Sequence, residues 1–363
     1  MKKIFFVFTV LLFIYSLVSI ASGAGIAGKN PKNQKHIALL LPSAKADNLN
    51  IAADILTKLL ESRGYKISIA DSQNSASLQI SQIEKLTDEK TDMLIIAPVR
   101  PAALSKVIAL AKEKNIKIIA FDKMIENAPI DFHIGFDAFQ IGVLQGKIIE
   151  KTLGLNIQQK GPFYFEIFSS PKEYSESILY YKGALSVLAP YLAKQRLRNR
   201  SGRFSFDASS QTNIDAQEAQ KRMEYLLSKY YVAGGLDAVL CAEDNFASGI
   251  IEALKKAGYK TDADFPIITG QNCLKENVKA IIDGEQTASV FKDYRILAEK
   301  TAEIADAVLN GKSFKNPPQT TYKYGNGAIP SILLDAKIVY KNDIQKEIFD
   351  SKYYKKAEIL KIK

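Results

Sequence analysis

The stretch Lys117-Ile-Ile-Ala-Phe-Asp-Lys-Met-Ile125 has the pattern of a buried strand that ends on two opposite charges. Its apolar run is short and rich in β-branched residues, which is typical of a strand covered on both faces. In open α/β sheets, ligands bind outside the carboxyl ends of the strands. We therefore expect Asp122 to accept hydrogen bonds from a ligand and Lys123 to donate them; the alternative is a surface ion pair at a strand end.

Strand-like and helix-like segments alternate on both sides of this stretch. The expected strands span residues 37–41, 66–70, 93–97, 116–121, 163–168, 236–240 and 265–269. The expected helices span residues 54–64, 78–86, 104–114, 139–153, 175–192, 216–231 and 246–257. This alternation predicts parallel, doubly wound sheets. Because the pattern restarts after Asp137, we expect two α/β lobes with a ligand cleft between them.

The composition is that of an ordinary globular protein. The chain has 363 residues, 47% of them hydrophobic and 24% charged, which is enough for two domains. The formal charge is +10, but the Lys and Arg residues are dispersed, and the densest cluster, Lys194 to Arg203, is interleaved with polar residues as in a solvated loop. We therefore expect no nucleic-acid partner.

The N-terminus has the pattern of a secretory signal. Lys2 and Lys3 precede an apolar run from Ile4 to Ile20, and small residues follow. This predicts a signal peptide over residues 1–24, a polar linker over 25–35 and a periplasmic or other extracytoplasmic location. Cleavage would remove two lysines and leave a charge of 10 − 2 = +8. The alternative is an uncleaved anchor, because the apolar run is long for a signal peptide.

Residues for catalysis or metal binding are scarce. The chain has two His and two Cys, and no pair has the spacing of metal ligands. We find no nucleophile elbow, no Walker loop and no dinucleotide fingerprint. We therefore predict no catalytic residues, no metal, no cofactor and no enzymatic activity. His36 and His133 are expected to be structural residues in strands.

The two cysteines are expected at one edge of a sheet. Cys241 follows the strand 236–240, and Cys273 follows the strand 265–269. We predict two small buried side chains. The alternative is a disulfide, which an oxidising compartment would preserve if the geometry allowed it.

Several motifs in a fixed order extend over almost the whole chain from His36. They are Gln79-Ile-Ser-Gln-Ile-Glu84, Phe121-Asp-Lys-Met-Ile125, Phe136-Asp-Ala-Phe-Gln-Ile-Gly-Val-Leu-Gln145, Lys160-Gly-Pro-Phe163, Gly183-Ala-Leu-Ser-Val-Leu188, Leu236-Asp-Ala-Val-Leu240, Gly270-Gln271, Gly284-Glu-Gln286, Val290-Phe-Lys-Asp293 and Pro330-Ser-Ile-Leu-Leu334. With these motifs the chain resembles the periplasmic sugar-binding proteins of ribose-type ABC importers, nearest the xylose-binding and multiple-sugar-binding branch.

The resemblance implies the type 1 periplasmic-binding-protein fold, with two doubly wound parallel-sheet lobes joined by a three-strand hinge. We expect residues 36–134 and 292–322 in the N-terminal lobe, and residues 135–291 and 323–363 in the C-terminal lobe. The implied partners are a small, sugar-like polar solute and an ABC permease or membrane sensor. We expect a monomer whose lobes close over one solute.

The same resemblance gives ten candidate ligand-binding positions. They are Asn48, Arg100, Asp122, Lys123, Tyr174, Ser175, Glu176, Asp244, Asn272 and Lys292. The family residue is kept only at Asp122, Asp244 and Lys292, and these three are expected to contact the ligand. Phe136, Phe246, Tyr174 and Phe291 are possible stacking surfaces, although core packing is the simpler interpretation of each.

The other candidate positions depart from the family pattern. Asn48-Leu49 replaces an Arg-Trp pair, Arg100 and Asn272 each replace an Asp, and Lys123 replaces an Arg. Tyr174-Ser175-Glu176 replaces an Asp-Asn-Asn run. A site built to bond one set of hydroxyls discriminates strongly against ligands that lack them, so these changes together predict a different ligand.

Two functions follow as hypotheses. The first is a solute receptor that does not bind glucose, galactose or xylose tightly; an anionic or amino-substituted sugar would suit its mixed charges. The alternative is a secreted scaffold-only relative that acts as a sensor or interaction protein.

Overall fold

The computed structural model describes residues 34–43, 47–157, 161–312, 320–324 and 327–362. The predicted signal peptide and all but the last two residues of the predicted linker lie outside the described residues. No helix in the described part of the chain combines the length and hydrophobicity needed to span a membrane.

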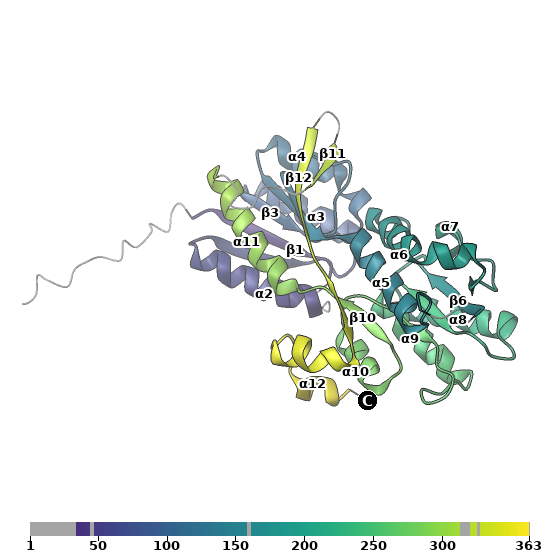
Figure 1. Ribbon diagram of the computed structural model, residues 1–363. Helices are drawn as coiled ribbons and strands as arrows, with labels where there is room; N and C mark the ends of the chain where they lie inside the picture. The colour runs from purple at the N-terminus through teal and green to yellow at the C-terminus, as the bar shows by residue number, and fades with distance from the viewer. Residues whose placement is uncertain (1–33, 44–46, 158–160, 313–319, 325–326, 363) are drawn as a thin grey trace, which may run out of the picture. The chain divides into compact units, whose positions relative to one another are not determined.

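The elements follow one another as strand and helix through most of the chain (Figure 1). The first are β1 (His36–Leu41), α2 (Asp47–Ser62), β2 (Lys66–Asp71), α3 (Ala76–Asp88), β3 (Met93–Ile96), α4 (Ser105–Glu113), β4 (Lys117–Asp122) and β5 (Phe132–Phe136). Next come α5 (Ala138–Thr152), β6 (Phe163–Phe168), α6 (Ser175–Ala193), β7 (Leu197–Arg198), α7 (Phe206–Ser209), α8 (Ala216–Tyr230), β8 (Ala238–Cys241), α9 (Asp244–Lys256), β9 (Ile267–Ile268), α10 (Lys275–Asp283) and β10 (Ala288–Phe291). The last are α11 (Tyr294–Asn310), β11 (Thr320–Tyr324), β12 (Gly327–Leu334), β13 (Lys337–Tyr340) and α12 (Lys356–Leu360).

The first lobe is a seven-stranded sheet in the order β11-β12-β5-β4-β3-β1-β2, parallel except for β11. Successive side chains of a strand point to opposite faces of the sheet. A strand with apolar residues at successive positions therefore contributes apolar side chains to both faces of the sheet. In β1, Leu39 packs with residues of α2 and α11, whereas Leu40 packs with residues of α3 and α4. Helices therefore cover both faces, which buries the sheet as the apolar strand patterns predicted.

The second lobe is built in the same way around a four-stranded parallel sheet, β7-β6-β8-β9. Leu240 of β8 packs toward α5 and α6, and its neighbour Val239 packs toward α8 and α9. A bridge between Gln271 and Val290 continues the lobe to β10, which pairs with β13. The α/β fold class predicted from the sequence is confirmed.

Each predicted strand and helix corresponds to an observed element, with differences at the ends. The largest difference is the start of α2, which we expected at Asp54 and which lies at Asp47. The first turn is polar in sequence and resembles a loop, yet Asn48 and Leu49 are both buried. Burial by tertiary contacts thus extends the helix beyond the segment that its own periodicity indicates.

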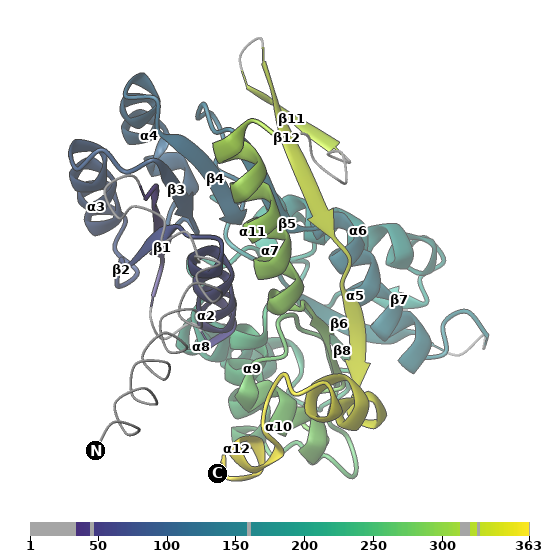
Figure 2. The same ribbon diagram turned by 90° about the vertical axis from the view of Figure 1, so that its left-hand side faces the viewer.

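Within the described residues, the chain crosses between the lobes three times, from β5 into α5, from β10 into α11 and from β12 into β13. Figure 2 shows β12 running out of the first sheet toward β13. The predicted lobe boundary was wrong here, because it placed residues 323–334 in the second lobe. β12 instead pairs in parallel with β5, with Ser331 opposite His133 and Leu334 opposite Phe136. Partners so far apart in sequence leave no local signal of the pairing.

Helices α5 and α6 pack with their backbones in close approach. A Cβ atom at Gly142 would lie 2.0 Å from the Tyr180 carbonyl oxygen, and one at Gly183 would lie 2.1 Å from the Phe139 carbonyl oxygen. A backbone oxygen cannot move aside as a flexible side chain can. Glycine is therefore required at both positions by the helix contact and not by its own backbone angles.

We predict that Gly142→Ala lowers the free energy of unfolding by about 1–3 kcal/mol, the usual cost of overpacking, even though alanine is the better helix former. The measurement is the denaturant midpoint with its slope. Lys147→Ala, at an exposed position of the same helix, is the control and should leave the midpoint almost unchanged. A midpoint for Gly142→Ala at or above wild type would contradict the close approach.

Candidate functional site

A cavity of about 1000 Å³ lies between the two lobes. Its lining comes from the carboxyl ends of β1, β3, β4 and β5, from the first turn of α6, from the loop before α9, and from the segment that follows β10. Both sheets thus present their carboxyl edges to one space, as the rule for open α/β sheets requires. Its size is at the upper end of the usual range for small-molecule sites.

Asp122 ends β4 in a strained turn. Its φ angle is +67°, and the amide of Lys123 donates to the Phe121 carbonyl at 2.9 Å, so the three residues form a γ-turn with the rare positive central angle. Gly135 lies opposite in β5, where a Cβ atom would come within 2.3 Å of the Asp122 carbonyl oxygen. Strained backbone of this kind is concentrated at functional sites, because the surrounding structure must hold it in place.

Lys292 is the buried cation of the cavity. Its ammonium lies 3.8 Å from Asp122 Oδ1, which also accepts a hydrogen bond from the Tyr294 hydroxyl at 3.2 Å. Burial alone would lower the pKa of Lys292, but attraction to Asp122 and to more weakly acting neighbours such as Glu243 raises it above its ordinary value. The lysine is therefore charged at neutral pH.

The start of α6 brings three candidate residues to the first lobe. The Tyr174 ring lies under the Lys123 ammonium, 3.7 Å from it, in a cation–π contact. Glu176 is 9% exposed, and its Oε1 accepts a hydrogen bond from the Met124 amide at 2.7 Å. Burial raises the pKa of Glu176, and the Met124 amide partly offsets this effect. Ser175 does not line the cavity; its hydroxyl donates to Glu176 at 3.3 Å.

The structure does not place Asp244 in the cavity. Its carboxylate accepts hydrogen bonds from the Leu274 amide at 3.0 Å, from the Gln286 amide group at 3.0 Å and from the Ser289 hydroxyl at 2.9 Å. Burial raises the pKa of Asp244 to about 7, against the effect of these donors. The expectation that Asp244 contacts the ligand is therefore not supported; the residue ties α9 to the segment before α10 and to β10.

Glu243, the residue before Asp244, faces the cavity instead. Its carboxylate accepts from the Ser170 hydroxyl at 2.9 Å and from the side-chain amides of Gln271 and Asn272, each at 3.2 Å. Burial raises the pKa of Glu243, and Lys292 partly offsets this effect. The sequence located the strand end correctly but could not show which of two adjacent acids points inward.

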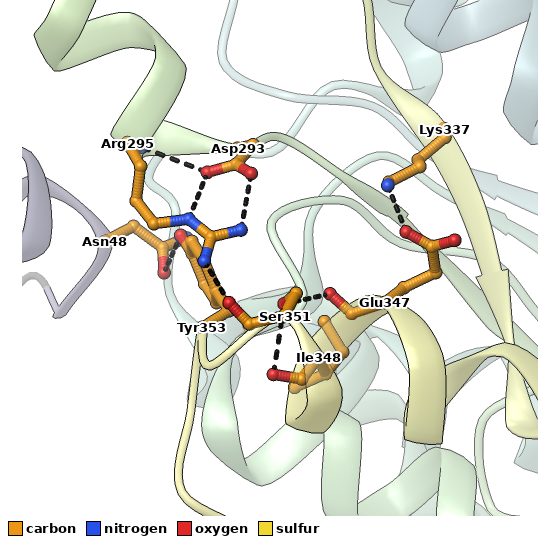
Figure 3. Close-up of polar contacts among 8 residues, drawn as sticks. All are labelled: Asn48, Asp293, Arg295, Lys337, Glu347, Ile348, Ser351 and Tyr353. Carbon is orange, nitrogen blue, oxygen red and sulfur yellow. Dashed lines mark hydrogen bonds and ion pairs between the residues drawn. The ribbon is translucent and has the colours of Figure 1, made fainter.

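Asn48 joins three parts of the molecule. Its amide donates to the Asn272 carbonyl at 3.0 Å, and its Oδ1 accepts from the hydroxyls of Tyr354 at 2.7 Å and Tyr353 at 3.3 Å. Figure 3 shows Asn48 and Tyr353 pointing toward each other. The tyrosines belong to the C-terminal segment, defined here as residues 341–362. The first turn of α2 is thus held by this segment and by the cavity wall of the second lobe.

A second contact nearby ties the C-terminal segment to α11. Arg295 donates to the Ser351 carbonyl at 2.6 Å and forms an ion pair with Asp293 at 2.7 Å (Figure 3). On the other side of the segment, Glu347 pairs with Lys337 of β13. These contacts fix the C-terminal segment between two of the three crossings.

The outer part of the cavity is more exposed. Arg100 lies 3.0 Å from Glu173 across the two lobes, with 57% of its side chain exposed. Phe136 and Tyr174 line the cavity, whereas Phe246 and Phe291 are buried in apolar clusters, so core packing is their role.

Eight of the ten predicted positions line the cavity, and Ser175 and Asp244 do not. The eight are Asn48, Arg100, Asp122, Lys123, Tyr174, Glu176, Asn272 and Lys292. Sequence reasoning missed Glu243, Tyr180, Ser177 and Tyr294 as lining residues. Glu243 directly precedes the predicted Asp244, and Tyr294 lies two residues after the predicted Lys292. This closeness in sequence was the available signal for these two residues.

The cysteines and histidines lie outside the cavity lining. Cys241 and Cys273 are buried free thiols, so the expected pair of small buried side chains is what the structure contains. His36 and His133 lie in strands β1 and β5, as expected. Burial lowers the pKa of His133 to about 4, which keeps it neutral at physiological pH.

Two doubly wound lobes that are linked by the crossings described above and present their carboxyl edges to a shared polar cavity define the solute-binding class of the periplasmic type. The chain belongs to the periplasmic binding protein domain family, whose model matches residues 37–313. The family expected from the sequence motifs is thereby confirmed.

Named relatives support this assignment over nearly the full length. A multiple sugar-binding periplasmic protein of Azospirillum brasilense is 34% identical over 336 residues, with 91% of this chain and 94% of the relative covered. A D-xylose-binding periplasmic protein of Escherichia coli is 32% identical over 309 residues, covering 84% of this chain and 87% of that protein. The crystal structure of an ABC transporter solute binding protein from Clostridium phytofermentans with bound β-D-glucose matches with a TM-score of 0.84 at 33% identity, covering 90% of this chain and all of that one.

We predict that Asp244→Ala destabilises the fold, because it leaves three donors without their acceptor, two of them, Gln286 and Ser289, fully buried. The expected loss in the free energy of unfolding is about 3 kcal/mol, on the scale of 1–3 kcal/mol for each unsatisfied buried group. Asp207→Ala is the control, because that side chain is 80% exposed in a surface ion pair worth about 0–1 kcal/mol. Equal denaturant midpoints for the two variants would show that the Asp244 network does not support the fold.

Proposed function

We propose that this protein captures a sugar or a related polar solute in the central cavity and delivers it to an ABC importer. The observation that supports this most directly is the cavity itself, which is lined by buried charged groups and aromatic rings from both lobes. Charge-assisted hydrogen bonds hold hydroxyl groups, and aromatic rings cover the apolar faces of a sugar. The relatives are sugar-binding periplasmic proteins by name, and one related structure contains glucose.

The proposed place of action is outside the cytoplasmic membrane, after cleavage of the predicted signal peptide. A membrane permease or a membrane sensor is the proposed partner, and the protein is proposed to act as a monomer. It is not proposed to be an enzyme, in keeping with relatives that are named as binding proteins.

A scaffold-only role is the second candidate, and one observation favours it. The lobes contact each other through the protein's own groups, namely Glu176 with the Met124 amide, Tyr174 with Lys123, and Asn48 with Asn272. A protein that closes on its own contacts needs no solute for closure. It could serve as a sensor or an interaction protein.

Thermal shift with a panel of sugars, amino sugars, sugar acids, polyols and nucleosides tests the two roles. A solute that binds only the folded state raises stability by about 2.7 kcal/mol at a hundredfold excess over its Kd. We expect at least one member of the panel to raise the melting temperature in a concentration-dependent way. If every member leaves the melting temperature unchanged at millimolar concentration, the receptor function is wrong and the scaffold role is favoured.

We further propose that glucose, galactose and xylose are not the tight ligands. Arg100, which replaces a family Asp, pairs with Glu173 across the lobes, and Asn48, in the place of an Arg, is occupied by Tyr353, Tyr354 and Asn272. The side chains of Arg100 and Asn48 therefore already have partners within the protein. Calorimetry with the three sugars should give dissociation constants weaker than about 1 μM, which is about −8 kcal/mol. Submicromolar binding of any one of them would refute this proposal.

A further inference from the structure

We propose that the solute in the central cavity carries a protonated amine, as an amino-substituted sugar does. This inference rests on the proposed function, because it names the chemical class of the solute for the same cavity. It follows from the balance of charge among the buried side chains that line the cavity, and from the hydrogen-bonding atoms that those side chains leave open.

The charged lining residues fall into two groups. Arg100, Glu173, Asp215 and Glu276 are exposed, and the half-buried Asp47 forms an ion pair of its own with Lys275 at 3.2 Å. Asp122, Lys123, Glu176, Glu243 and Lys292 are buried or half-buried. The inner group thus contains three acids and two bases, and solvent screens these charges less than it screens those at the mouth.

Among the described residues, the two inner bases form no ion pair with the acids of the second lobe. Lys292 pairs with Asp122 at 3.8 Å. Lys123 places its ammonium over the Tyr174 ring at 3.7 Å. Within the described residues, neither lysine lies within ion-pair distance of Glu176 or Glu243.

Glu176 and Glu243 are instead held by neutral donors. Glu176 accepts from the Met124 amide and the Ser175 hydroxyl, and Glu243 accepts from a serine hydroxyl and two side-chain amides. These bonds orient the carboxylates without cancelling their charge. Lys123 acts on both acids and Lys292 on Glu243 only from beyond ion-pair distance, so burial still raises the pKa of both carboxyl groups. This cost of burial falls when a cation enters and contacts them.

Other lining atoms also suit a donor-rich ligand. Asn272 Oδ1 and Ser177 Oγ are buried without a hydrogen-bond partner in the described part of the chain, and Ser177 is only 1% exposed. Asn272 Oδ1 can only accept a hydrogen bond, whereas an ammonium group offers three donors and no acceptor. The ring of Tyr180 adds a surface that favours a cation. Charge, open acceptors and aromatic faces therefore indicate the same chemical group.

Calorimetry with matched sugar pairs tests the inference on the purified protein at about pH 6, where a primary amine is protonated. The pairs are D-glucosamine with D-glucose and D-galactosamine with D-galactose, which differ only in one amino or hydroxyl group. We expect at least one amino sugar to bind at least tenfold more tightly than its parent, or about 1.4 kcal/mol. Equal or tighter binding of the parent in both pairs overturns the inference.

The same titrations, with D-glucuronate added, separate the two proposals. If a neutral sugar or D-glucuronate binds and the amino sugars do not, the amine inference is wrong while sugar binding stands. If none of these compounds binds at millimolar concentration, the amine inference is wrong, and the wider thermal-shift panel decides whether the receptor function also fails.

Two variants test whether Glu176 and Glu243 cause the preference for an amino sugar. Glu176→Gln and Glu243→Gln keep the shape of the side chain and remove its charge. The preference is the Kd of the parent sugar divided by the Kd of the amino sugar, and each variant should reduce this ratio by about tenfold. Glu61→Gln, at an exposed position of α2 remote from the cavity lining, should leave the ratio at its wild-type value. If the ratio is unchanged in both cavity variants, the carboxylates do not select the amine. Measuring both allows a conclusion even if one of them does not fold.

Discussion

A buried ammonium needs a counter-charge, and Lys292, at the crossing that follows β10, finds it in Asp122 at the end of β4 in the first lobe. Leaving one member of such a pair alone costs about 3–5 kcal/mol, so the two strand ends that present them must stay in register. Lys292 directly follows β10 at the second crossing, and Asp122 ends β4. This one contact therefore constrains how the lobes meet, and the remaining groups of the cavity are arranged around it.

The strained turn at Asp122 shows how the fold sustains that contact. A positive φ is unfavourable for an aspartate, yet β4 is hydrogen-bonded on both sides and Gly135 leaves room for the Asp122 carbonyl. The sheet supplies the rigidity, and the glycine supplies the space. The backbone geometry sets the direction in which the Asp122 side chain leaves the strand, and the Tyr294 hydroxyl and the Lys292 ammonium hold its carboxylate.

The sequence predicted the parts of this protein that depend on local pattern. Apolar runs located β4 and its polar end, and the family motifs located eight of the ten candidate positions at the cavity. The sequence could not predict the direction in which a side chain points. Asp244 was therefore predicted as the cavity residue, whereas its neighbour Glu243 faces the cavity. The sequence also assigned β12 to the wrong lobe, because the pairing with β5 joins segments almost two hundred residues apart. Both failures concern tertiary contacts, which leave no periodicity in the chain.

The hydrogen bonds of Asn48 have a consequence for the rates at which a solute enters and leaves the cavity. Its bonds to Asn272, Tyr353 and Tyr354 hold the two lobes together with atoms of the protein alone. Wherever entry or release of a solute requires the lobes to separate, these bonds must open first. Contacts of this kind slow exchange in both directions and lengthen the residence time of whatever is inside. Such a protein is suited to retaining a scarce molecule over a long interval and less suited to rapid turnover of an abundant one.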